Sequence, residues 1–126
     1  MNLEIEEKAS GDCILLALDN VCATYTAENG EIFGNLGKSN AYFVFSTCIS
    51  DDQVMAEGFS DSWKAGVRAA FHCPNNRLAE SWEEIKSYMF ALMKECDCKF
   101  VLSFQYEKIY AIRNEGEINF INQMTF

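Results

Sequence analysis

The segment 99–126 alternates apolar and polar side chains, and two short polar breaks divide it into three pieces. These pieces are 99–106, 109–113 and 117–123. An alternation with a period of two is typical of β-strands that bury one face. The second break, Asn114-Glu115-Gly116, contains a glycine that can take a positive φ, as a three-residue hairpin loop requires. The segment therefore predicts a three-stranded antiparallel meander.

A meander alone is marginally stable in water, so its apolar face needs a covering element. The sequence immediately upstream predicts a helix, because apolar side chains recur there at spacings of four and three residues. These side chains are Leu78, Trp82, Ile85, Met89 and Leu92. Ser81-Trp82-Glu83-Glu84 has the form of a capping box at the start of a helix. We expect this helix to lie across the meander.

The first fifty residues predict strands around one ambiguous segment. Residues 2–7 alternate and predict a short edge strand whose glutamates discourage edge-to-edge pairing. Residues 13–27 favour a helix, and the alternative is a hairpin that turns at Asp19-Asn20 and is followed by another at Asn29-Gly30. Residues 41–49 are apolar on both faces, which predicts a central strand.

Two further helices are predicted between residues 50 and 74. Ser50-Asp51-Asp52-Gln53 has the form of a capping box, and Gly58 suits the position after the last turn. The second helix starts at Asp61 or Ser62 and stops at Pro74. With 126 residues, 49% of them hydrophobic, the chain can bury a core of ordinary size. We predict a single α+β domain over 1–126, an antiparallel sheet with the C-terminal meander packed against helices.

The six cysteines are expected to be reduced. The N-terminal sequence Met1-Asn2-Leu3-Glu4-Ile5 lacks the basic and apolar regions of a signal peptide, which favours the cytosol. No apolar run approaches the roughly 20 residues that a membrane-spanning helix needs. Most of these cysteines should therefore behave as small hydrophobic side chains.

The net charge of −9 is concentrated in one half of the chain. Residues 1–61 hold eleven acidic side chains and two lysines, whereas residues 62–126 hold eight acidic and eight basic ones. A negative field repels nucleic acids and anionic membranes and attracts basic proteins. It also simply keeps a protein dissolved, so charge alone does not define a partner.

His72 and Cys73 are the first candidates for catalysis. A thiolate–imidazole pair needs its two side chains to meet, but neighbouring residues on a helix point about 100° apart. His72 could instead meet a cysteine from elsewhere in the chain, which leaves a small thiol enzyme as an alternative. The paired carboxylates at 51–52 and 83–84 fall in predicted first helical turns, where the helix dipole explains them.

Cys96-Asp97-Cys98 is the candidate for metal binding. A structural zinc site needs four ligands, commonly from two knuckles, and the chain offers only one C-x-C pair. His72 and Cys73 could complete a zinc site with Cys96 and Cys98 if the fold brings the two pairs together. The simpler interpretation is that these residues have structural roles. We therefore predict no catalytic residue, no metal ligand and no cofactor.

In its size, its acidity and its lack of a site of its own, the chain resembles bacterial immunity proteins, including those paired with contact-dependent growth-inhibition toxins. The resemblance is one of general layout over the whole chain. It implies a cytoplasmic, non-enzymatic protein that forms a one-to-one complex with a basic toxin, often a nuclease. Carboxylates would occupy the place of the substrate phosphates, and electrostatic steering would make association fast and sensitive to salt.

The acidic first half supplies the residues expected to bind such a partner. They are Glu28, Glu31, Asp51, Asp52, Glu57 and Asp61. An alternative of the same class is a phage-encoded inhibitor that mimics nucleic acid and blocks a host defence enzyme. An acidic secretion chaperone is a further alternative, but such chaperones usually end in a helix and this chain is predicted to end in strands.

Overall fold

Eight strands of the computed structural model, which describes residues 1–126, pair into one sheet in which all neighbours are antiparallel. The strands are β1 (Asn2–Glu6), β2 (Thr24–Glu28), β3 (Glu31–Asn35), β4 (Tyr42–Ser46), β5 (Ala65–His72), β6 (Phe100–Phe104), β7 (Lys108–Arg113) and β8 (Asn119–Phe120). Their order across the sheet is β2-β3-β4-β5-β1-β6-β7-β8. The two α-helices are α1 (Gly11–Asn20) and α2 (Leu78–Glu95), and a 3-10 turn (Asn75–Arg77) precedes α2.

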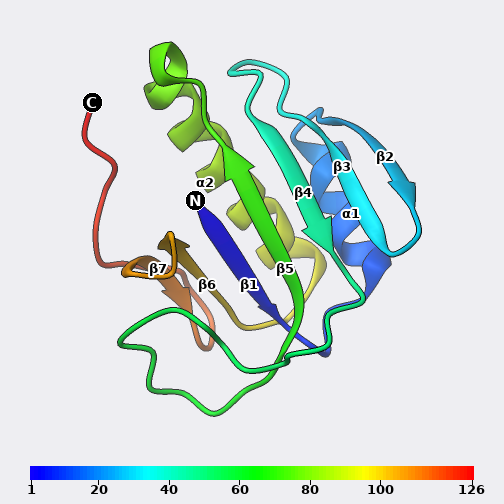
Figure 1. The fold of residues 1–126 in the computed structure, drawn as a ribbon, viewed down its shortest axis with the longest axis vertical. Coiled ribbons are helices and arrows are strands. Elements are labelled where there is room, and N and C mark those ends of the chain that lie inside the picture. The colour runs from blue at the N-terminus through cyan, green and yellow to red at the C-terminus, as the bar shows by residue number, and fades with distance from the viewer.

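Both helices cover the same face of the sheet, behind it in the view of Figure 1. The main apolar core lies between this face and the helices, because alternate strand residues such as Leu3, Ile5, Phe43 and Phe45 point toward them. Tyr88 of α2 is fully buried among these side chains and packs edge-on against Phe45. The chain is thus a single α+β domain, which confirms the predicted fold class.

The C-terminal meander and its covering helix are confirmed. β6, β7 and β8 are adjacent in the sheet, although β8 has only two residues. Gly116, in the loop before β8, has a φ of +68°, as expected for the hairpin connection. Trp82 of α2 packs edge-on against Tyr110 of β7 and Phe120 of β8.

The strand predicted at 2–7 exists, but its placement at an edge was wrong. β1 lies in the interior of the sheet between β5 and β6, and hydrogen bonds to both. Glu4 is therefore fully buried rather than a guard against edge pairing. The outer edges are β2 and the very short β8.

The ambiguous segment 13–27 contains a helix and a strand. α1 ends at Asn20, and Cys22 takes a positive φ of 58° before β2 begins at Thr24. β2 and β3 then form the hairpin that turns at Asn29-Gly30. The strand predicted at 41–49 is β4, and it lies inside the sheet as expected.

The helices predicted at 50–58 and from residue 61 onward were wrong. The first segment belongs to a long loop between β4 and β5, and the second supplies β5. In β5, Val67, Ala69 and Phe71 face the core with a period of two, a pattern that the neighbouring alanines had also made compatible with a helix. β1 and β4 provide hydrogen-bonding partners on both sides of β5, which favours a strand over a helix in this segment.

The predicted start of α2 was also wrong, because Ser81 lies inside the helix and is buried. Glu84, one turn further on, accepts hydrogen bonds from the backbone N–H groups of Lys38 (3.0 Å) and Ser39 (2.6 Å). Its carboxylate thus fastens the β3–β4 connection to α2 and does not cap the helix.

Candidate interaction surface

A buried ion pair lies on the face of the sheet that the helices leave uncovered. Glu4 on β1 and Arg68 on β5 are cross-strand partners, and the Arg68 Nε lies 3.1 Å from a Glu4 carboxylate oxygen. The Glu4 side chain is 0% exposed and the Arg68 side chain 14%. Burying a charge is costly unless its hydrogen-bonding groups are satisfied, so this pair requires further hydrogen-bonding partners.

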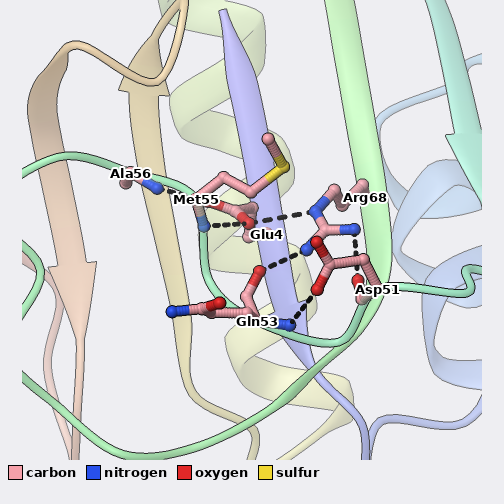
Figure 2. Close-up of polar contacts among 6 residues, drawn as sticks. All are labelled: Glu4, Asp51, Gln53, Met55, Ala56 and Arg68. Carbon is pink, nitrogen blue, oxygen red and sulfur yellow. Dashed lines mark hydrogen bonds and ion pairs between the residues drawn. The ribbon is translucent and has the colours of Figure 1, made fainter.

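The β4–β5 connection, residues 47–64, supplies the missing partners. The Glu4 carboxylate accepts the backbone N–H groups of Met55 (2.9 Å) and Ala56 (3.1 Å). The Arg68 guanidinium donates to the backbone carbonyls of Asp51 (2.6 Å) and Gln53. Figure 2 shows the loop backbone wrapped over the two side chains. We call residues 47–64 the acidic loop, and the Glu4–Arg68 pair fixes its path across the sheet.

Apolar contacts hold the far part of the acidic loop. Ala56 and Trp63 form a small second core with Val101 of β6, separate from the helix-side core. Phe59 packs edge-on against Trp63, with ring centroids 5.1 Å apart. At the loop's outermost part, the Glu57 N–H donates to the carbonyl of Tyr106 (2.6 Å) in the β6–β7 turn. Burial, with a smaller contribution from the Glu4 carboxylate, raises the pKa of Tyr106.

The structure places the four predicted acids of this loop at the surface. Asp51, Asp52, Glu57 and Asp61 are all exposed. Asp52 and Asp61 line one cavity of about 430 Å³. Each also faces a lysine at long range: Lys64 is 3.7 Å from Asp52, and Lys99 is 4.0 Å from Asp61. The Asp52–Lys64 pair is exposed and contributes little to stability, whereas the Lys99 and Asp61 side chains are only 30% and 32% exposed.

Glu28 and Glu31, the other two predicted acids, flank the Asn29-Gly30 turn and are cross-strand partners. Both are exposed. The Gly30 carbonyl accepts hydrogen bonds from the backbone N–H and the hydroxyl of Thr47, each at 2.8 Å. The hairpin tip therefore adjoins the start of the acidic loop. Glu57 and Asp61 lie further away, Glu57 beside the β6–β7 turn and Asp61 beside Lys99 before β6.

The convergence of His72 and Cys73 with Cys96 and Cys98, which the sequence left open as an alternative, does not occur. His72 is the last residue of β5, whereas Cys98 precedes β6. The sheet register pairs Ile5 with Phe100 and Asn2 with Ala70, so the two cysteine-containing segments lie at opposite ends of the sheet. No group of three or more histidine, cysteine, aspartate or glutamate side chains is placed to hold a metal ion.

His72 and Cys73 instead line a cavity of about 580 Å³. His72 lies beside Tyr42, with ring centroids 6.1 Å apart, and it makes no side-chain hydrogen bond. The cavity is mostly apolar, and Leu78, Phe104 and Tyr110 are part of its wall. The amino group of Met1 also reaches this cavity, and burial there lowers its pKa, with an opposing contribution from Cys73.

Sequence reasoning missed Glu4 and Arg68, which organise the whole surface. Glu4 was assigned to the solvent side of an edge strand, and Arg68 fell within a predicted helix. The burial of Glu4 follows from the position of β1 between β5 and β6, because an interior strand can bury both of its faces.

The chain matches no protein-family model, and neither a curated protein nor a solved structure is significantly similar to it. Neither α-helix combines the length and the apolar character that crossing a bilayer requires.

Proposed function

We propose that this protein is an acidic binding protein that neutralises a basic protein partner, most simply as an immunity protein that blocks a cognate nuclease toxin. The observation that carries the proposal is the buried Glu4–Arg68 pair, which holds the acidic loop in one conformation while its carboxylates face solvent. A surface ordered before binding loses less entropy on association, which favours a tight complex.

The Glu28–Glu31 pair supports a role in binding. Like charges directly opposite each other on neighbouring strands destabilise a sheet. Neither glutamate has a basic partner in the protein that would offset this cost. A basic surface docked on the hairpin tip and the adjoining loop would supply the missing positive charge.

The charge also defines the kind of partner. A negative surface disfavours nucleic acid and anionic membrane, and it accelerates encounter with a cationic protein. We propose the cytoplasm as the compartment, since all six cysteines are free, as is usual in reducing compartments. The mechanism needs no enzymatic activity and no cofactor, because covering the partner's active surface is sufficient.

Affinity capture from the native cell, followed by kinetics with the purified partner, tests the proposal. A basic protein, with a nuclease as the favoured case, should be captured, and its association rate should fall steeply as salt rises. D51N/D52N should lower the association rate several-fold at low salt. E80Q/E83Q removes the same charge from α2 and is the matched control, which should leave the rate nearly unchanged.

An association rate that ignores salt, or that falls equally in both double variants, would contradict the proposed surface. Capture of an acidic partner or of a nucleic acid would contradict the proposed class of partner.

A further inference from the structure

Three cysteines lie near one another where the start of α1 packs against the end of α2. Cys13 lies in the first turn of α1, Cys96 directly follows α2, and Cys98 precedes β6. The Cys13 thiol donates to the carbonyl of Glu95 at 3.3 Å, which brings it next to the neighbouring residue Cys96. Burial raises the pKa of the Cys96 thiol, and the Cys98 and Cys13 thiols lie close enough to affect it as well. All three are reduced in this structure.

The backbone on both sides of this thiol cluster is fixed. On the α1 side, Ser10 is the N-cap: its hydroxyl accepts the Cys13 N–H and donates to the Cys13 sulfur, each at 3.2 Å. On the other side, the Arg113 guanidinium donates to the carbonyls of Cys96 (2.8 Å) and Cys98 (3.2 Å). Two independent sets of hydrogen bonds therefore hold the backbone on either side of the point where the Cys13 thiol meets the Glu95 carbonyl.

The three thiols differ in their access to solvent. Cys13 and Cys96 are partly exposed, whereas Cys98 is 2% exposed. Burial raises the pKa of Cys98 to about 12, so this thiol stays protonated at neutral pH and is a poor nucleophile. Burial also raises the pKa of Cys96. Cys13 and Cys96 are thus the members of the cluster that an oxidant in solution can reach.

We propose that Cys13 and Cys96 are a redox modification site, which a peroxide converts into a reversible disulfide that joins α1 to α2. The Cys13 sulfur attacks the peroxide, an S–O bond forms and the O–O bond breaks, which leaves a sulfenic acid and one water. The Cys96 sulfur then attacks this sulfenic sulfur, the S–S bond forms, and the S–O bond breaks to release a second water. The two thiols lose two electrons and two protons, and hydrogen peroxide becomes two waters.

A Cys96–Cys98 bond is the competing product. Burial of Cys98, which is 2% exposed, screens its thiol from the oxidant and disfavours this bond.

Mapping of disulfide-linked peptides after treatment of the full chain with hydrogen peroxide tests the site. We expect the intact protein to lose the mass of two hydrogen atoms, and the linked peptides to contain Cys13 and Cys96. Dithiothreitol should restore the original mass. The oxidised form should have a higher midpoint of thermal unfolding, because the bond restrains the unfolded chain.

Variants separate this pair from the other cysteines. C13S and C96S should each abolish the bond, while C98A and C22S should retain it. C22S removes an exposed cysteine away from the cluster and is the control for general thiol chemistry. A map that links Cys96 to Cys98, or a chain in which Cys13 is oxidised to the sulfinic acid without any cross-link, would overturn the proposal.

Discussion

The two faces of the sheet are held by different physical means. The helix-side face is closed by apolar packing, in which Phe43, Phe45 and Tyr88 are fully buried. The opposite face is closed by the acidic loop, whose backbone is fastened to one carboxylate and one guanidinium. Apolar packing is non-directional and tolerates repacking, whereas the Glu4–Arg68 contacts specify one loop path. The first face provides the stability of the domain, and the second orders a surface.

The largest loss of stability should come from a substitution on the helix-side face. W82A removes a side chain that is 3% exposed and packed between α2 and the meander, so it should lower the free energy of unfolding by about 3–5 kcal/mol. F90A is the matched control, because Phe90 lies on the same helix but is 43% exposed. Urea unfolding measures both. Equal losses for the two variants would show that the helix does not pack as described.

The next largest loss of stability should come from a substitution in the buried ion pair. R68A leaves the fully buried Glu4 charge without its partner, which should cost about 3 kcal/mol in the same measurement. E4L/R68M removes both charges and should recover much of that loss. K64A, on the exposed Lys64, should change stability by less than about 0.5 kcal/mol. A single variant R68A as stable as the wild type would contradict the role of the pair.

A smaller loss of stability, caused by groups buried on the helix-side face, should appear at alkaline pH. Burial raises the pKa of Cys98 from 9.0 to about 12 and the pKa of Tyr88 well above 10.0. Between pH 9.0 and 12 the unfolded chain gives up the Cys98 proton while the folded protein keeps it, so stability is complete below pH 9.0 and falls as pH rises toward 12.

Urea unfolding at neutral and at alkaline pH measures this fall. C98A should reduce its steepness, and C22S, at an exposed position, should leave it unchanged. A pH dependence identical in C98A and the wild type would show that Cys98 is not desolvated as the structure describes.

The smallest effect on stability should be a gain instead of a loss. E28T removes one of two like charges that lie opposite each other at the hairpin tip, so it should raise the free energy of unfolding by about 0.2–1 kcal/mol. The same variant should bind the basic partner more weakly. A gain in stability without any loss of affinity would remove the hairpin tip from the proposed surface.

The helix-side face was largely predictable from the sequence. The spacing of Trp82, Ile85 and Met89 defines one stripe, and the alternation after Lys99 defines the strands that the stripe covers. Both signals are local, because each comes from residues that are close in the sequence. The boundaries of α2 and the length of the last strand differed, and β5, which also faces this core, was wrongly predicted as a helix.

The acidic loop was not predictable by the same means. Its conformation depends on Glu4, which is 51 residues away from Met55 in the sequence. Ser50 to Gln53 satisfy a local rule for starting a helix, but the hydrogen bonds to Glu4 and Arg68 take up the backbone groups that a helix would use. Acidic composition predicted which residues face solvent, and only the sheet register showed how they lie relative to one another.

Amide hydrogen exchange at Met55 and Ala56 tests most directly whether the Glu4–Arg68 pair orders the acidic loop. In the wild type both amides should exchange far more slowly than in an unstructured peptide, because the Glu4 carboxylate holds them. In R68A their protection should fall by more than that of Tyr88 and Leu92 in α2. Rapid exchange of Met55 and Ala56 in the wild type, or the same loss of protection in the loop and in α2, would contradict a loop that is fixed before any partner binds.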